Sequence, residues 1–198
     1  MTSRILIING HPDPRPERLC TAIADAYAAG AQAAGRQIRR IDVGALNVPL
    51  LHTMDQFRNE APGAEMAAAQ EAIRWATHIV FIHPLWLGGQ PAMFRAFLEQ
   101  VFRYGFALAD PGSASGSASA SGLLKGRSAR IIVTMGMPAI VFRLAFGAWG
   151  ARAFERGVLW LCGVSPIRRT VLGGVETASL ATRKVWLGKV RRLGAEGA

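Results

Sequence analysis

The segment HPLWLGGQPAMFRAFLEQVF, residues 83–102, joins a strongly apolar run to an amphipathic helix pattern. The apolar run, residues 78–83, is short, continuous and rich in β-branched side chains, which is typical of a strand buried on both faces. Trp86, Gly88 and Gly89 lie between this strand and the helix. Because glycine lets a backbone approach a ligand closely and tryptophan offers a flat apolar surface, the segment favours a bound planar ring system. The structural alternative is a buried core tryptophan beside a tight turn.

Strand and helix patterns alternate along the whole chain. We expect strands at residues 4–9, 37–43, 78–83, 129–134 and 168–172, and helices at residues 16–35, 65–76, 91–103, 139–161 with a break at 147–150, and 179–193. This alternation predicts an α/β fold with a five-stranded parallel sheet, right-handed crossovers and helices on both faces. The chain, residues 1–198, is long enough for one domain and short for two. Residues 47–61 are expected to form a loop, and the Ser/Ala/Gly-rich run at 109–122 a flexible loop within the domain.

Composition narrows the class of protein. Hydrophobic residues make up 51% of the chain, and the formal net charge is +10. All basic residues except Lys125, Lys184 and Lys189 are arginines, and they are scattered without a zinc-finger or RNA-recognition motif, so we expect no nucleic-acid partner. Two cysteines, no signal-peptide pattern and no uninterrupted apolar stretch of membrane length predict a cytoplasmic protein without stable membrane insertion. The four histidines lack metal-ligand spacing, so we expect no metal site.

In such sheets, ligands bind beyond the carboxyl ends of the strands. The first candidate loop, NGHPDPRPERL at residues 9–19, leads into a helix start, where backbone amides and the helix dipole attract anions. His11 and Arg18 add donors, so a phosphate would fit; a proline-stiffened turn with surface arginines is the alternative. Residues 134–140, TMGMPAI, form a further loop with exposed amides. No GxGxxG or GxxxxGK[ST] motif is present, which argues against a Rossmann nicotinamide site and a P-loop nucleotidase.

The chain resembles the flavodoxin-like NAD(P)H:quinone oxidoreductase family, with its bacterial quinone reductases and the ancillary proteins of potassium efflux systems. The resemblance is carried by GHP at residues 10–12, HPLWLGGQPAMFRAFLEQVFRYGFA at 83–107, LLKGRSARIIVTMG at 123–136 and LCG at 161–163. It implies a flavodoxin-like three-layer sandwich, one flavin per subunit, FAD or FMN, and NAD(P)H as co-substrate. It also implies a homodimer with the site at the subunit interface, and transfer of two electrons from the nicotinamide to a quinone or similar planar acceptor.

The resemblance further implies a cofactor site in three parts. The residues are His11, Arg18 and Cys20 beside the flavin's phosphates and ribityl chain; Pro84, Leu85, Trp86, Leu87 and Gly88 along one edge of the isoalloxazine ring; and Thr134, Met135, Gly136 and Met137 along its other edge.

Two positions depart from the family pattern. The family has a tyrosine and a histidine, thought to assist charge movement, where this chain has Phe142 and Trp149. Neither side chain can relay a proton, so no catalytic side chain is assigned. Either another acceptor is used, or solvent provides the proton, or the protein is a flavin-binding regulatory subunit with little turnover. Because the aromatic residues Phe142, Phe146, Trp149 and Phe154 exceed what one sheet face needs, we expect their helix to contribute to a partner interface.

Overall fold

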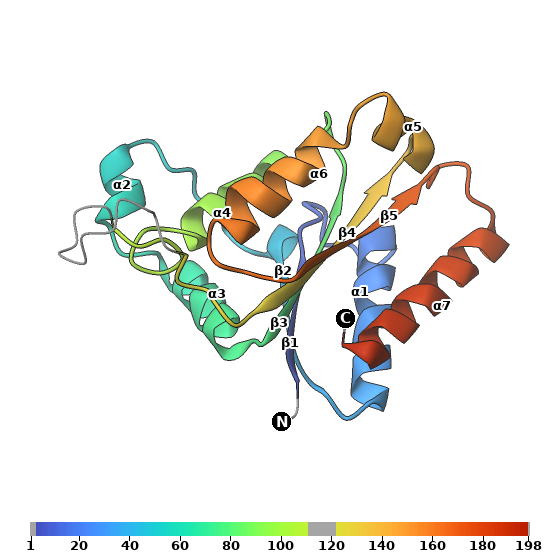
Figure 1. Cartoon of the computed structure of the whole chain (residues 1–198), viewed down its shortest axis with the longest axis horizontal. Coiled ribbons are helices and arrows are strands. Elements are labelled where there is room, and N and C mark those ends of the chain that lie inside the picture. The colour runs from blue at the N-terminus through green and yellow to red at the C-terminus, as the bar shows by residue number, and fades with distance from the viewer. Residues whose placement is uncertain (1–2, 111–121, 198) are drawn as a thin grey trace.

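The computed structural model describes residues 3–110 and 122–197, and within them the chain forms a parallel sheet flanked by helices (Figure 1). The strands follow the order β2-β1-β3-β4-β5. Their bounds are Arg4–Asn9 (β1), Gln37–Asp42 (β2), His78–Pro84 (β3), Ser128–Met135 (β4) and Ile167–Gly173 (β5). The prediction of a five-stranded parallel sheet is confirmed, and its order is the flavodoxin-like one that the resemblance implied.

Helices cover both faces of this sheet and complete a three-layer sandwich (Figure 1). One face is covered by α1 (Leu19–Ala33) and α7 (Leu180–Glu196). The other is covered by α3 (Ala64–Trp75), α4 (Ala92–Val101), α5 (Ala139–Leu144), α6 (Trp149–Phe154) and the π-helical turn η2 (Glu155–Trp160). A 3-10 turn, η1 (Val43–Ala45), and a short helix, α2 (Met54–Arg58), lie between β2 and α3.

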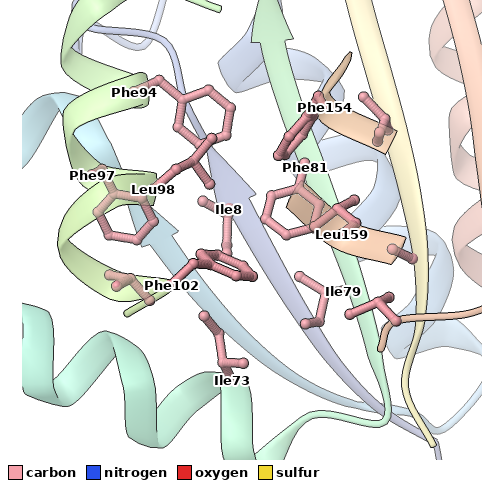
Figure 2. Packing of buried hydrophobic residues seen from close by; sticks show 14 of the residues in the cluster. Ile8, Ile73, Ile79, Phe81, Phe94, Phe97, Leu98, Phe102, Phe154 and Leu159 are labelled. Carbon is pink, nitrogen blue, oxygen red and sulfur yellow. The ribbon is translucent and has the colours of Figure 1, made fainter. Parts of the chain in front are cut away.

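The central strand β3 explains why its sequence is a continuous apolar run. All of its residues are buried, and alternate side chains enter the two cores: Phe81 packs in the core under α3, α4 and α6, whereas Ile82 packs under α1 and α7. Figure 2 shows Phe81 surrounded by aromatic rings, with the Phe154 ring centroid 5.2 Å from its own. Burial of one such side chain stabilises the fold by about 2–3 kcal/mol, so this strand anchors the segment that follows it.

Among the described residues, the sequence-based expectations differ from the structure at two places. The predicted helix at residues 139–161 is divided into α5, α6 and η2, and the expected break is confirmed at Gly147 and Ala148, which both have positive φ. Residues 47–61 are not all loop, because Thr53 and Gln56 form a capping box that starts α2. The flexible loop predicted at 109–122 lies, except for its ends, outside the described residues. In the described part of the chain, no helix has the length and apolarity needed to span a membrane.

Helices α1 and α7 touch backbone to backbone. A Cβ atom built on Gly30 would overlap the carbonyl oxygen of Arg191 and lie 2.8 Å from its carbonyl carbon. A Cβ on Gly194 would similarly lie 3.0 Å from the carbonyl carbon of Tyr27. These two glycines therefore set the distance between the helices.

We expect Gly30→Ala to lower the free energy of unfolding by about 2 kcal/mol or more, since the backbone of α7 has to move. The matched control is Gly188→Ala, because a Cβ at Gly188 meets no atom within 4 Å. The control should raise the free energy of unfolding by up to about 1 kcal/mol through helix propensity. Urea denaturation measures both, and equal stability of Gly30→Ala and the unmodified protein would contradict this packing.

Candidate functional site

Three loops meet at the carboxyl edge of the sheet, because β1, β3 and β4 are neighbours there. The amide of Gly10, after β1, donates a hydrogen bond of 2.7 Å to the carbonyl of Ile82. The amide of Leu85, after β3, donates one of 2.7 Å to the carbonyl of Thr134 near the end of β4. Backbone hydrogen bonds therefore fix the three predicted loops side by side.

Asn9 and Asp13 shape the first loop, and sequence analysis missed both. The Oδ1 atom of Asn9 accepts a hydrogen bond of 3.2 Å from the amide of His11, and its Nδ2 atom donates one of 3.0 Å to Asp42. The Asp13 carboxylate pairs with the guanidinium groups of Arg15 and Arg18. Hydrogen bonding from the Arg15 amide, together with the Arg15 side chain, lowers the pKa of Asp13. The sequence indicated this pairing of Asp13 with two arginines only through its spacing, since Asp13, Arg15 and Arg18 lie within six residues.

Arg18, a predicted phosphate ligand, is thus engaged by Asp13: its Nε atom donates to Asp13 at 2.7 Å. Arg15 and Arg18 share this one carboxylate, but Glu17 lies in the same loop, so the loop itself carries no formal net charge. The positive character of this corner comes from the start of α1, because no side chain caps the helix and no acidic residue lies in its first turn. The first amides of a helix have no intrahelical partner, and the end of the helix that carries them is positive. This corner of the site can accept an anion.

Cys20 lies in that first helical turn and is buried. Its Sγ atom is 3.5 Å from Oγ1 of Thr134, and burial raises the pKa of the thiol to about 11. The thiol is therefore protonated at neutral pH and has no free surface. Any contribution of Cys20 to ligand binding has to come from its backbone amide.

His11 connects the first and second loops. Its Nδ1 atom lies 3.0 Å from the amide nitrogen and 3.1 Å from the carbonyl oxygen of Asp13, so it accepts from the amide in one tautomer, with the proton on Nε2, and donates to the carbonyl in the other. The His11 ring lies edge-on to the Trp86 ring with 6.2 Å between their centroids. Burial lowers the pKa of His11, so the ring is neutral at pH 7 and can donate one hydrogen bond.

The second loop is a tight turn at residues 86–89. Trp86 and Gly89 exchange backbone hydrogen bonds of 3.0 and 2.9 Å, and Leu87 and Gly88 have φ angles of 47° and 80°, as in a type I′ turn. Half of the Trp86 surface is exposed and Leu87 is fully exposed, so the alternative of a buried core tryptophan is wrong. A Cβ atom on Gly88 or Gly89 would meet no atom within 4 Å, so this turn faces open space. Pro84, which precedes the turn, is buried at the end of β3.

The third loop begins at Gly136. The side chains of Thr134 and Met135, at the end of β4, are buried and anchor the start of the loop in the core. The backbone amides of Gly136 and Met137 donate no hydrogen bond within the described part of the chain. The Glu176 carboxylate lies close by, since a Cβ on Gly136 would be 3.0 Å from Oε1 of that side chain. Sequence analysis gave no indication of this acid, which comes from the segment after β5.

The two positions that depart from the family pattern have different environments. Phe142 is buried in the core beside β4, whereas 71% of the Trp149 surface is exposed. The Arg152 guanidinium carbon lies 5.5 Å from the centroid of the Trp149 ring. Phe154 is also fully buried, so of the four aromatic residues expected at a partner interface only Phe146 and Trp149 face outward. The expectation for Phe142 and Phe154 was wrong, because the division of the helix turns both rings inward.

Two hollows lie beside the edge strands of the sheet, β5 and β2. One of about 690 Å³ lies beside β5 and is lined by Glu155, Trp160 and Ile167, among others. The other, of about 610 Å³, lies between β2 and α3. None of the predicted cofactor residues lines either hollow. Within residues 3–110 and 122–197, no group of three or more His, Cys, Asp and Glu side chains could hold a metal ion.

Comparison with known proteins gives matches along nearly the whole chain. A family model described as flavodoxin-like fold matches residues 3–189. The chain is 25% identical over 205 residues to ribosyldihydronicotinamide dehydrogenase [quinone] of Pongo abelii, covering 91% of this chain and 86% of that protein.

Two solved structures share the arrangement. The NAD(P)H:quinone oxidoreductase of Methanothermobacter marburgensis superposes with a TM-score of 0.79 at 18% identity, covering 99% of this chain and 97% of that one. An FMN-dependent NADH-azoreductase of Bacillus anthracis, in complex with FMN, superposes with a TM-score of 0.76 at 14% identity, covering 98% and 99%. At these identities the superpositions establish the shared fold.

Beneath the second loop, His83 is a buried titratable group. Its Nδ1 atom donates a hydrogen bond of 2.9 Å to the carbonyl of Pro84, and its ring packs against Phe94 and Phe154. Burial lowers the pKa of His83 to about 4, below the value of 6.5 for a free histidine. The neutral ring therefore contributes stability above pH 6.5, and this contribution is lost as the pH falls towards 4.

His83→Phe should remove part of this pH dependence. Between pH 7.5 and pH 5, the unmodified protein should lose about 2 kcal/mol of unfolding free energy through His83, and the variant should not. Denaturant titrations at both pH values measure the difference. The exposed His52 provides the control variant His52→Gln, which should keep the loss. If the unfolding free energy of His83→Phe has the same pH dependence as that of the unmodified protein, burial does not lower the pKa of His83.

Proposed function

The chain belongs to the family of proteins with a flavodoxin-like fold, and on that premise we propose that it is a flavin-dependent oxidoreductase that passes two electrons from NAD(P)H to a quinone or similar planar acceptor. The names of the similar proteins support this reaction class: a quinone dehydrogenase, an NAD(P)H:quinone oxidoreductase and an FMN-dependent azoreductase. One observation carries the proposal: three features lie at the same edge of the sheet. They are the half-exposed Trp86, the turn at residues 86–89 with open space around its glycines, and the amides of Gly136 and Met137, which donate no hydrogen bond within the described residues.

The residues at this edge fit a flavin, FMN or FAD. The uncapped start of α1, the ring of His11 and the Arg18 guanidinium, which shares the Asp13 carboxylate with Arg15, suit a phosphate. Trp86 offers a ring face, and the bare backbone of Gly88 leaves space for a flat ligand edge. A flavin bound there would supply the redox chemistry, since it accepts a hydride from a nicotinamide and passes both electrons on.

The chain's own contribution is positioning, exclusion of water and electrostatics. Trp86, Leu87 and Trp149 expose apolar surface around the edge and suit a planar acceptor of low charge. The free amides of Gly136 and Met137 are donors that stabilise negative charge without reorganisation. The Cys20 thiol is protonated and buried, and Phe142 is a core residue, so neither moves a proton during the reaction. His11, the ionisable side chain beside Trp86, is neutral at pH 7, and the proposed source of the proton that the acceptor needs is solvent.

A second candidate function is a flavin-binding regulatory or ancillary subunit with little turnover. It is favoured by Phe142 and Trp149, which carry no ionisable group where the related enzymes have a tyrosine and a histidine. Steady-state oxidation of NADH and NADPH with a benzoquinone separates the two functions. Turnover by the flavin-loaded protein supports the enzyme, and its absence in a fully loaded protein supports the regulatory subunit.

Trp86→Ala should weaken flavin binding, because the ring face offered to the isoalloxazine is lost. We expect the unmodified protein to bind one FMN or FAD per chain, and the variant to show a dissociation constant about tenfold higher or more, in line with the roughly 1–3 kcal/mol of one aromatic stack. Titration followed by release and chromatography of the flavin measures affinity and identity. Trp186→Phe, on α7 of the opposite face, is the control. A protein that binds neither flavin would refute the proposed function.

We also propose that the protein is a homodimer in the cytoplasm. Both cysteines are free thiols, which suits a reducing compartment. The outer surface of α5 and α6 exposes large apolar side chains, which are Ile140, Val141, Leu144, Phe146 and Trp149. Exposed apolar side chains gathered in this way mark an interaction surface, and a second copy of the chain is its proposed occupant because the family resemblance implies a homodimer with the site at the subunit interface.

Leu144→Arg should convert the dimer to monomer, because it places a charge in the centre of that surface. The matched control is Leu180→Arg at the start of α7, since the two leucines are 79% and 78% exposed. Sedimentation velocity measures the molecular mass of each variant. A dimer that survives Leu144→Arg would remove α5 and α6 from the interface.

A further inference from the structure

Helix α6 lies directly against the turn at residues 86–89. A Cβ atom on Gly150 would overlap the carbonyl oxygen of Gly88, and would lie 2.8 Å from its carbonyl carbon and 3.2 Å from the Cα atom of Gly89. All three obstructing atoms belong to the backbone, so no side-chain rotation can make room. Glycine at position 150 is therefore a condition of this contact.

The backbone is constrained on both sides of the contact. Leu87, one residue before Gly88, has a φ angle of 47°, and Ala148, the N-cap of α6, has a φ angle of 52°. Residues with a Cβ atom rarely adopt such angles, which persist where the surrounding structure holds them. The turn and the start of α6 hold each other in place through this contact.

The opposite side of the turn has no such support. Cβ atoms on Gly88 and Gly89 would meet nothing within 4 Å. The start of α6 is therefore the backbone contact that holds the turn in its position. The position of Trp86, the first residue of the turn, depends on the same contact.

We propose that Gly150 is a positioning residue for the cofactor: its bare Cα sets the position of the turn at residues 86–89, and thereby of the Trp86 ring and the Gly88 backbone that face the flavin. This inference rests on the proposed function. It assigns a role to a residue that touches neither cofactor nor acceptor and acts only through the turn.

Gly150→Ala tests the inference. The turn has to move, which displaces the Trp86 ring and the Gly88 backbone, so the flavin dissociation constant should rise about tenfold or more, as for the loss of one aromatic stacking contact. The midpoint potential and the visible absorption spectrum of the bound flavin should shift as well, which a purely structural defect would not cause. Gly157→Ala is the control, because its Cβ meets no atom within 4 Å. A dissociation constant, potential and spectrum like those of the unmodified protein would overturn the proposal.

Two further measurements keep the outcome clear. The amide of Gly89 donates to the carbonyl of Trp86, so its hydrogen exchange reports the turn without any flavin. Faster exchange at Gly89 in Gly150→Ala supports the positioning role even if the unmodified protein binds no flavin, in which case the proposed function fails alone. Unchanged exchange there, beside normal flavin binding by the unmodified protein, refutes the positioning role alone.

A double-mutant cycle covers the case in which Gly150→Ala folds poorly. Leu87→Gly permits the positive φ angle without a side chain and lets the turn take other conformations. The double variant should bind the flavin at least about fivefold more tightly than additive effects of Leu87→Gly and Gly150→Ala would give, since mutations at residues in contact have non-additive effects. Strictly additive changes in affinity would show that position 150 does not act through the turn.

Discussion

Close approach of backbone to backbone at the carboxyl edge of the sheet is the constraint on which the candidate site depends. A Cβ on Gly44 would lie 2.6 Å from the carbonyl oxygen of Pro12, and one on Gly173 would lie 2.8 Å from that of Met137. Gly150 makes the third such approach, to the turn at residues 86–89. These glycines bring the loops together without side chains between them, and the edge presents the amides of Gly136 and Met137 beside the exposed ring of Trp86. Such a surface suits a ligand that is recognised by backbone hydrogen bonds and one ring face.

Sequence patterns predicted most of the fold because β1, β3 and β4 are buried almost throughout and have apolar sequences, the most continuous of which is that of β3. Topology then predicted which loops would meet, since parallel strands end at one edge. The side-chain partners inside those loops were not predictable: Arg18 is held by Asp13, and Glu176 reaches Gly136 from a distant segment. Burial of Phe142 was equally hidden, because it follows from the left-handed residues that divide the helix, and not from helical periodicity.

Part of the positive charge has a structural role, because several arginines donate hydrogen bonds to backbone carbonyls. Arg103 donates to the carbonyls of Gln56 and Glu60 and ties α2 to the end of α4. Arg127 donates to carbonyls at the end of α3, at Ile73 and Arg74. Arg36 donates to the carbonyl of Ala195 in the last turn of α7, where a cation complements the helix dipole. These three guanidinium groups stabilise helix ends and fasten loops, so this part of the net charge of +10 serves the fold itself.

The lack of an ionisable side chain at positions 142 and 149 constrains the chemistry of the site. Under the proposed function, an acceptor takes its proton from water, which requires that the apolar rim leave the site open to solvent. Trp149 and Leu87 remain exposed, which is compatible with an open site. The protein's remaining means of lowering the barrier are the amides of Gly136 and Met137 and the placement of Trp86, both fixed before any ligand binds. Accuracy of the turn therefore matters more here than in an enzyme with its own acid, and this is why a backbone contact as remote as that of Gly150 bears on function.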